Sequence, residues 1–249
     1  MKVKYPTKLS EIPLVNYQKW INTAKNTNDE ELLAHKFVQI FLGLELNDVR
    51  RMNAKDVNFF IEKVIEVLNH KPKFQKRWKY GHVEFGLIPD LENMSWGEYI
   101  DIESNMHQVE NWHKAMAVLY RPITETYKDT YNIGAYTGDD LLHEPMKHAP
   151  LEVVLGVQVF FYHLEKELLS STLSSLEHQM KSLKNETTNT AKQPNLTSNG
   201  DSITASIKSL KATLQNLTLL QPYHYIKHSH SSATKYKKIE SNITELIDN

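Results

Sequence analysis

The sequence predicts a mainly α-helical fold: an irregular helical domain with a small β-hairpin insertion and a C-terminal helical arm. Only 8 glycines and 9 prolines occur in 249 residues, whereas a sandwich or barrel needs frequent turns. Apolar residues also recur at three- and four-residue steps over several long segments, as they do along one face of a helix. At this length, with 40% hydrophobic residues, the chain can bury a sizeable core.

Three amphipathic helices are predicted before residue 70. The first covers about 14–21. The second begins with the capping-box spacing of Thr27 and Glu30 and ends near Gly43. The third covers about 54–68 and is followed by a proline, which cannot continue a helix.

A hairpin and a central helix follow. Apolar and polar residues alternate on both sides of Gly81, which predicts a β-hairpin at about 74–88. Ser95 and Glu98 have the spacing of a capping box, and Pro122 would end the helix, so the central helix is expected at about 95–120. Its expected core-facing stripe is Tyr99, Ile102, Met106, Val109, Trp112, Met116, Leu119 and Tyr120.

The second half of the chain is expected to be mostly helical. Residues 127–150 are predicted to be mainly loop, with at most one strand. A long helix is predicted at about 150–182. The predicted divisions are a helical core domain at 1–183, a polar linker at 184–202, and a C-terminal helical arm with a basic tail at 203–249.

The arm carries an apolar stripe that must pack on something. Its residues, the expected partner contacts, are Ile203, Ile207, Leu210, Leu214 and Leu217. The arm can fold back on the long helix of its own chain or bind a neighbouring subunit. We expect the neighbour, because ordering an arm in trans would give specificity to an oligomer.

Composition excludes several classes of function. Without cysteine the chain has no disulfide, thiolate metal site or cysteine nucleophile. It contains no phosphate-binding glycine loop, dinucleotide fingerprint or complete catalytic signature, so we expect no enzymatic activity and no cofactor. The net charge of −1 gives no global attraction to nucleic acid, and no apolar run reaches the roughly 20 residues of a membrane span.

One basic segment interleaves with aromatic residues. Its candidate nucleic-acid contacts are Lys73, Phe74, Lys76, Arg77, Trp78 and Lys79. Cations beside stacking aromatics are typical of a surface that binds single-stranded nucleic acid. The same pattern is typical of an edge strand protected by lysines, with its aromatics in the core, and we favour this second interpretation.

Three groups of potential metal ligands are incomplete. Glu110 and His113 have E-x-x-H spacing, with Glu103 and His107 before them, but a di-iron site needs a second such helix. The segment 143–148, HEPMKH, is one residue too long for a zinc signature, and its proline would disrupt the helix. The spacing of the histidines at 224, 228 and 230 defines no site, so no metal is expected.

Four stretches carry a resemblance to a known family: LSEIPLVNYQKW, FGLIPDLENMSWGEYIDIE, WHKAMAVLYRPI and GVQVFFYHLEKELL. The arrangement of the first 180 residues resembles uncharacterised proteins of tailed bacteriophages, including crAss-like and related phages. The resemblance implies a non-enzymatic structural or assembly protein of the virion, in the tail or neck region and assembled in the bacterial cytoplasm. It implies other phage structural proteins as partners, and an oligomer or ring.

Two alternatives stay open from the sequence. The first is a tail assembly chaperone that is absent from the mature virion. The second is a single-stranded nucleic-acid-binding protein that uses the segment 71–80, where each phosphate contact would make binding depend on salt concentration.

Overall fold

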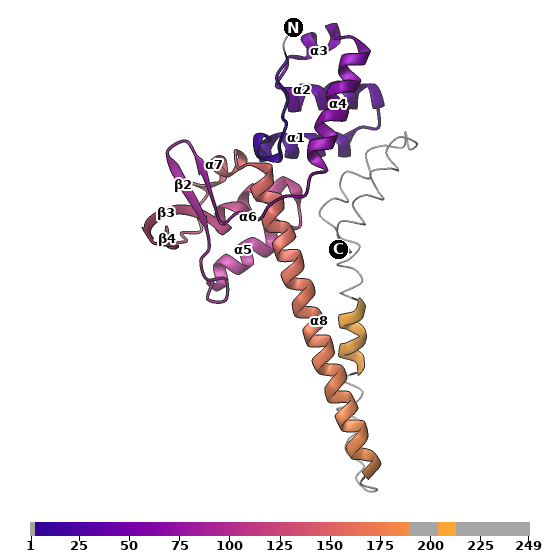
Figure 1. The fold of residues 1–249 in the computed structure, drawn as a ribbon, viewed down its shortest axis with the longest axis vertical. Helices are drawn as coiled ribbons and strands as arrows, with labels where there is room; N and C mark the ends of the chain where they lie inside the picture. Colours follow the sequence, from indigo (N-terminus) through magenta and orange to yellow (C-terminus); the bar gives the residue numbers. More distant parts are fainter. Residues whose placement is uncertain (1–2, 190–203, 213–249) are drawn as a thin grey trace. The chain divides into compact units, whose positions relative to one another are not determined.

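A computed structural model describes residues 3–189 and 204–212. The chain divides into two compact units, and the boundary lies inside one long helix, between Val157 and Gln158. Among the described residues, the first unit comprises 3–157 and the second comprises 158–189 and 204–212. The fold is mainly α-helical with a small antiparallel sheet, as the sequence predicts (Figure 1).

Helices form the part of the first unit that precedes the sheet. A 3-10 turn, η1 (Leu9–Glu11), precedes α1 (Leu14–Asn26), α2 (Glu30–Leu42), α3 (Leu46–Arg51) and α4 (Ala54–Leu68). Helices α1, α2 and α4 lie where the periodicity predicts them, and Gly43 ends α2 in the left-handed conformation that favours glycine. Aromatic rings of α1 and α2 join their buried faces, because Trp20 meets Phe37 edge-on at 4.8 Å between ring centroids.

The start of α2 differs from the predicted capping box. Asp29 is the N-cap, and its carboxylate accepts hydrogen bonds from the backbone N–H groups of Glu31 and Leu32. The hydroxyl of Thr27 accepts instead from the N–H of Asp29. The spacing rule missed this because a carboxylate two residues later is an equally good cap. The short helix α3 has no clear periodic signal and was not predicted.

The sheet has four antiparallel strands in the order β1-β2-β3-β4. The strands are β1 (Arg77–Tyr80), β2 (Val83–Leu87), β3 (Tyr120–Tyr127) and β4 (Thr130–Ile133). The predicted hairpin at 74–88 is confirmed as β1 and β2, which are joined through Gly81 at a positive φ of 57°. A second hairpin, β3 and β4, occupies part of the region predicted to be mainly loop.

The two faces of the sheet differ in character. Trp78 and Phe85 lie opposite each other in register, stack at 4.8 Å between ring centroids and are buried. The other face carries Arg77, Gly86 and Arg121 in one row across three strands. On that face the ring of Tyr131 occupies the space beside Gly86, where a Cβ would overlap it. One face therefore belongs to the core and the other carries cations and an aromatic ring.

The predicted central helix is two helices. Helix α5 (Trp96–Met106) ends at His107, a 3-10 turn η2 (Val109–Asn111) follows, and α6 (Trp112–Leu119) then continues directly into β3. The break exists because the indole N–H of Trp112 donates to the Met106 carbonyl, a bond that turns the chain instead of extending the helix. The periodic stripe runs across the break, so periodicity could not locate it.

The first unit closes with α7 (His143–Lys147) and the start of α8 (Leu151–Asn189). Pro145 does not prevent α7, contrary to the prediction, because it lies in the first turn, where a missing N–H removes no helical hydrogen bond. Gly156 of α8 lies against the chain just before β1: a Cβ on it would be 2.5 Å from the Lys73 carbonyl oxygen. This close approach fixes the segment that leads into β1.

The second unit contains the rest of α8 and a helical segment at 204–212. Helix α8 extends to Asn189, so the first six residues of the predicted linker are helical. Its less exposed side chains recur at alternating steps of four and three, the repeat of a helix that packs along another helix. The residues in this repeat are Tyr162, Lys166, Leu169, Leu173, Leu176 and Met180, and their neighbours Phe161 and Glu177 are also half-buried. No helix within 3–189 or 204–212 is long and apolar enough to cross a bilayer.

The helical segment 204–212 packs on α8 of its own chain. Lys211 forms an ion pair with Glu177 at 2.8 Å, and the Thr204 hydroxyl donates to the Met180 sulfur at 3.5 Å. Ile207 is buried and Leu210 is half-buried. The expectation that this arm packs on a neighbouring subunit is therefore corrected for the described part. Ile203, Leu214 and Leu217 lie outside the described residues, as does the predicted basic tail.

Gly156→Ala tests the close approach of α8 to the Lys73 carbonyl. In an open helix this change would stabilise by about 1 kcal/mol, because alanine has the higher helix propensity. We expect the opposite sign here, a loss of about 1–3 kcal/mol in the free energy of unfolding, because backbone must move to admit the methyl group.

Urea denaturation measures this change. Gly134→Ala is the control, because the nearest atom to a Cβ there is 3.8 Å away, an ordinary contact. A stabilised Gly156→Ala variant would contradict the close approach.

Candidate interaction surface

Helix α5 begins with the capping box that the sequence predicts. The Ser95 hydroxyl accepts from the N–H of Glu98 at 3.3 Å, and the Glu98 carboxylate accepts from the N–H of Ser95 at 2.7 Å. The two bonds satisfy two donors at the helix start and hold Glu98 in one conformation. The first turn of α5 is therefore rigid.

The polar side of α5 faces the protein interior. Glu98 forms an ion pair of 2.6 Å with Arg121 of β3, and both side chains are more than 90% buried. One turn later, the carboxylate of Asp101 accepts a short hydrogen bond from the Tyr136 hydroxyl. Partners 23 and 35 residues away in the chain thus fix the helix by its charged side.

These contacts shift the pKa values of both groups. Burial disfavours the charged form of Glu98, but hydrogen bonds from Ser95 and the Arg121 guanidinium outweigh it and lower its pKa. The hydrogen bond to Asp101, together with burial, raises the pKa of Tyr136 to about 12. At neutral pH the carboxylate of Glu98 is ionised and the phenol of Tyr136 is protonated.

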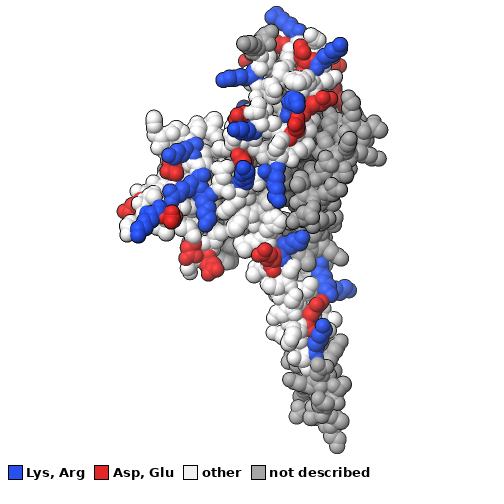
Figure 2. Space-filling model, viewed as in Figure 1, with Lys and Arg blue, Asp and Glu red and all other residues white. Residues whose placement is uncertain are grey.

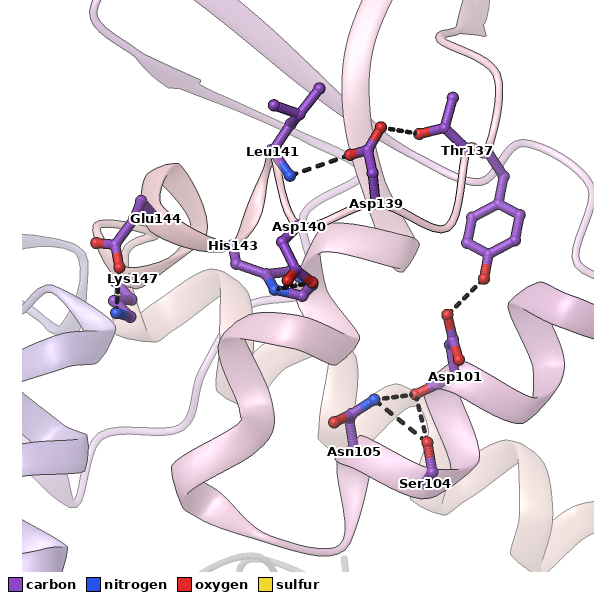
Figure 3. Close-up of polar contacts among 11 residues, drawn as sticks. Asp101, Ser104, Asn105, Thr137, Asp139, Asp140, Leu141, His143, Glu144 and Lys147 are labelled. Atoms are coloured by element: carbon purple, nitrogen blue, oxygen red, sulfur yellow. Dashed lines mark hydrogen bonds and ion pairs between the residues drawn. The ribbon is translucent and has the colours of Figure 1, made fainter.

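The loop after β4 wraps over α5. The Tyr136 ring lies against Gly97, where a Cβ would be 3.0 Å from the ring, so the small residue admits the ring. Beyond it, the Thr137 hydroxyl donates to Asp139 at 2.6 Å, and the same carboxylate accepts from the N–H of Leu141 at 3.0 Å. Figure 3 shows this loop above the helix, with Asp101 directed towards it.

The opposite side of α5 presents large apolar side chains to solvent. Trp96, Tyr99 and Ile100 are 76%, 45% and 40% exposed, and the indole and phenol rings stack at 5.5 Å between centroids. Together with exposed Glu103 they occupy positions i, i+3, i+4 and i+7, a single helix face. We call these four residues the α5 face. The helix is thus inverted relative to an ordinary surface helix, which buries its apolar side.

The stretch of chain that contains this face is acidic. Residues 80–113 contain seven Asp or Glu residues and no Lys or Arg. Of these acids, Glu98 is paired with Arg121 and Glu110 with Lys25 at 2.6 Å, whereas Asp90, Glu92 and Glu103 are exposed. An exposed aromatic pair within this acidic stretch is typical of a binding surface for a basic partner.

The basic segment before and within β1 occupies an edge of the sheet, as the favoured interpretation predicts, but of its three aromatic residues only Trp78 is in the core, since Phe74 and Tyr80 are exposed. Trp78 is only 5% exposed and is stacked on Phe85, so it cannot stack on a nucleic-acid base. Arg77 lies over the Tyr131 ring at 4.4 Å, whereas Lys73, Lys76 and Lys79 are exposed and Phe74 is 37% exposed. The lysines of the proposed nucleic-acid surface are thus exposed, but its central aromatic residue, Trp78, is buried.

The four residues considered for a di-iron site do not form a ligand set. The helix break separates Glu103 and His107 from Glu110 and His113. Glu110 is paired with Lys25, and Nδ1 of His113 accepts from the Gln18 amide at 3.2 Å. The described ranges contain no cluster of three or more His, Asp or Glu residues that could bind a metal ion.

The first histidine of the HEPMKH segment is part of a local surface network. His143 bonds Asp140 at 3.0 Å, Lys147 pairs with Glu144, and these residues lie together around α7 (Figure 3). The His143 ring meets His113 edge-on at 6.0 Å between centroids. The histidines at 224, 228 and 230 lie outside the described residues.

Sequence reasoning missed the α5 face as a site. It assigned Tyr99 to the core because the stripe of Ile102 and Met106 includes it, yet those two are only half-buried. The sequence did contain a signal for this surface, because Trp96, Tyr99 and Ile100 form a second apolar stripe on α5. A helix of eleven residues cannot bury this stripe and the stripe of Ile102 and Met106 against the same neighbour.

Comparison with known proteins does not identify the chain. No protein-family model, curated protein or solved structure matches it.

Arg121→Met tests the buried ion pair. The change leaves the Glu98 carboxylate buried without its counter-ion, so we expect a loss of about 3–5 kcal/mol in the free energy of unfolding. Adding Glu98→Gln should recover much of the lost stability, because glutamine carries no charge and its side-chain oxygen can still accept from the Ser95 N–H. Urea denaturation of the single and double variants measures both. Equal stability of Arg121→Met and the parent would refute the role of the pair.

His113 should make stability depend on pH. Burial, with help from the nearby cation Lys147, lowers its pKa from 6.5 to about 4, so the folded protein keeps it neutral where the unfolded chain is protonated. This contribution is complete above pH 6.5 and is lost as pH falls from 6.5 towards 4.

Melting temperatures between pH 7 and 4.5 measure this effect, and histidine NMR signals report the pKa directly. His113→Asn should flatten the dependence, whereas the same change at exposed His82 should not. If the melting temperatures of His113→Asn and the parent fall in parallel as the pH is lowered, His113 is not the source of the pH dependence.

Proposed function

We propose that this protein is a non-enzymatic structural or assembly protein that acts through protein–protein contacts, and that the α5 face is its main binding surface. The observation that carries the proposal is the inverted helix. Trp96, Tyr99 and Ile100 are exposed on a helix whose carboxylates at 98 and 101 are held inward by Arg121 and Tyr136. Exposing three large apolar side chains disfavours the isolated protein, so a partner that covers them explains their position.

The chemistry of the face supports a protein partner. Tryptophan and tyrosine contribute most to binding in many interfaces, because they bury a large area with few rotatable bonds. The capping box at Ser95 and the ion pair of Glu98 preorganise the helix, so little conformational entropy would be lost on binding. The face is thus a rigid, aromatic and partly acidic surface.

The resemblance to tailed-phage proteins suggests the assembly in which the contacts are made. Two of the stretches that carry it include Trp96 of α5 and Arg121 of β3, which build the surface. We therefore propose a place in the virion, in the tail or neck region, with other phage structural proteins as partners and assembly in the bacterial cytoplasm.

Mass spectrometry of purified virions separates the virion component from the tail assembly chaperone. Peptides of this chain in stoichiometric amounts would support the component, whereas their absence from virions, together with their presence in infected cells, would favour the chaperone.

Trp96→Ser, alone or with Tyr99→Ser, should leave the fold intact but reduce incorporation into particles, or binding to the partner, by tenfold or more, about 1.4 kcal/mol for each tenfold step. Incorporation is measured by complementation and quantitative immunoblotting of particles. Tyr127→Ser is the matched control, since this tyrosine is 73% exposed but lies on β3. Normal incorporation of the double variant would exclude the α5 face.

A further inference from the structure

We propose that the α5 face binds the basic edge of the sheet in a second copy of this chain, so that copies join head to tail. The basic edge is defined here as Lys73, Lys76, Arg77 and Lys79. This inference rests on the proposed function and names a partner for the surface described above. Its basis is that one chain carries two exposed surfaces of opposite charge.

The basic edge is rigid and accessible. Residues 71–79 contain five Lys or Arg residues and no acid. The Lys76 carbonyl accepts from the N–H of Leu87 at 2.8 Å and from the Tyr131 hydroxyl at 3.2 Å, which fixes the backbone while the side chain remains exposed. Lys79 approaches Glu84 only at 3.9 Å, and its side chain is 70% exposed. These cations are held on a fixed frame with little internal neutralisation.

The α5 face offers the complementary groups. Glu103 lies on the face itself, and exposed Glu92 lies in the loop that leads into α5. The stretch 80–113 supplies no cation of its own. Figure 2 shows one side of the molecule, with Lys and Arg gathered over the sheet beside a few acidic side chains, and further acidic side chains at the lower rim of this unit.

The contact also suits the aromatic rings. Lysine and arginine bind over the faces of tryptophan and tyrosine by cation–π attraction, which strengthens when water is excluded. The chain already contains one such contact, since Arg77 lies 4.4 Å from the centre of the Tyr131 ring. The stacked pair of Trp96 and Tyr99 can accept the lysine side chains in the same way while their carbon stems cover the rings.

Charge decides the symmetry of the contact. Two α5 faces brought together would oppose acids to acids, and two basic edges would oppose cations to cations, so pairing like with like is disfavoured. Pairing unlike surfaces leaves one free surface of each kind on every dimer. Such head-to-tail contacts extend until a ring closes or a filament forms.

Charge-reversal variants of the purified full chain test the head-to-tail contact between the α5 face and the basic edge. Variant one is Lys73→Glu with Lys76→Glu, and variant two is Glu92→Lys with Glu103→Lys. Each alone carries two surfaces of like charge, so each should self-associate at least about tenfold more weakly than the parent. Mixed in equal amounts, they restore unlike pairing at every contact and should recover the mass distribution of the parent. Sedimentation velocity and light scattering measure the masses.

The control is Lys4→Glu with Lys55→Glu, which makes the same change in net charge at exposed positions away from the sheet. It should associate like the parent. Recovery on mixing, with weaker association of the parent at high salt, would support the inference.

Three results would overturn it: a monomeric parent at about 100 μM, undiminished association of either variant, or no recovery on mixing. If one of these occurs while Trp96→Ser still prevents incorporation into particles, the proposed function stands with a different protein as the partner.

Discussion

The buried ion pair between Glu98 and Arg121 determines which side of α5 is turned towards β3. Two charges taken out of water destabilise a protein unless they meet each other and their remaining hydrogen bonds are made. Here the carboxylate also closes the capping box, so it is held by the helix start and by the strand together. The ion pair sets the rotation of α5 about its axis. Because Glu98 and Asp101 point inward, Trp96 and Tyr99 lie on the opposite side of the helix, towards solvent.

This arrangement reverses the usual relation between burial and polarity. A charged group at the centre of the contact gives orientation, since a hydrophobic side chain can be buried at many rotations of a helix but an ion pair at only one. The hydrogen bond of Tyr136 to Asp101 repeats the constraint one turn later. The apolar side of α5 is left to solvent by this geometry, and so it is available to a partner.

The sequence predicts what is local and misses what is long-range. The capping box of Ser95, the glycine end of α2 and the alternation around Gly81 each depend on a few neighbouring residues, and all three appear in the structure. The break between α5 and α6 depends on where the Trp112 indole finds an acceptor, and the inversion of α5 depends on Arg121, 23 residues away. Periodicity carries neither kind of information, so Tyr99 was assigned to the core and the candidate surface was not recognised.

The direct passage from α6 into β3 has a consequence for how the chain can vary. Leu119 ends the helix, Tyr120 begins the strand, and its hydroxyl donates to the Gln75 carbonyl from inside the core. Side chains alternate along a strand, so one residue inserted at this junction would exchange the faces of everything after it. Tyr120 would leave the face that carries Trp78 and Phe85, and Arg121 would move onto that face and lose its ion pair with Glu98. Insertions and deletions should therefore be tolerated in the turns of the two hairpins and selected against between residues 119 and 121.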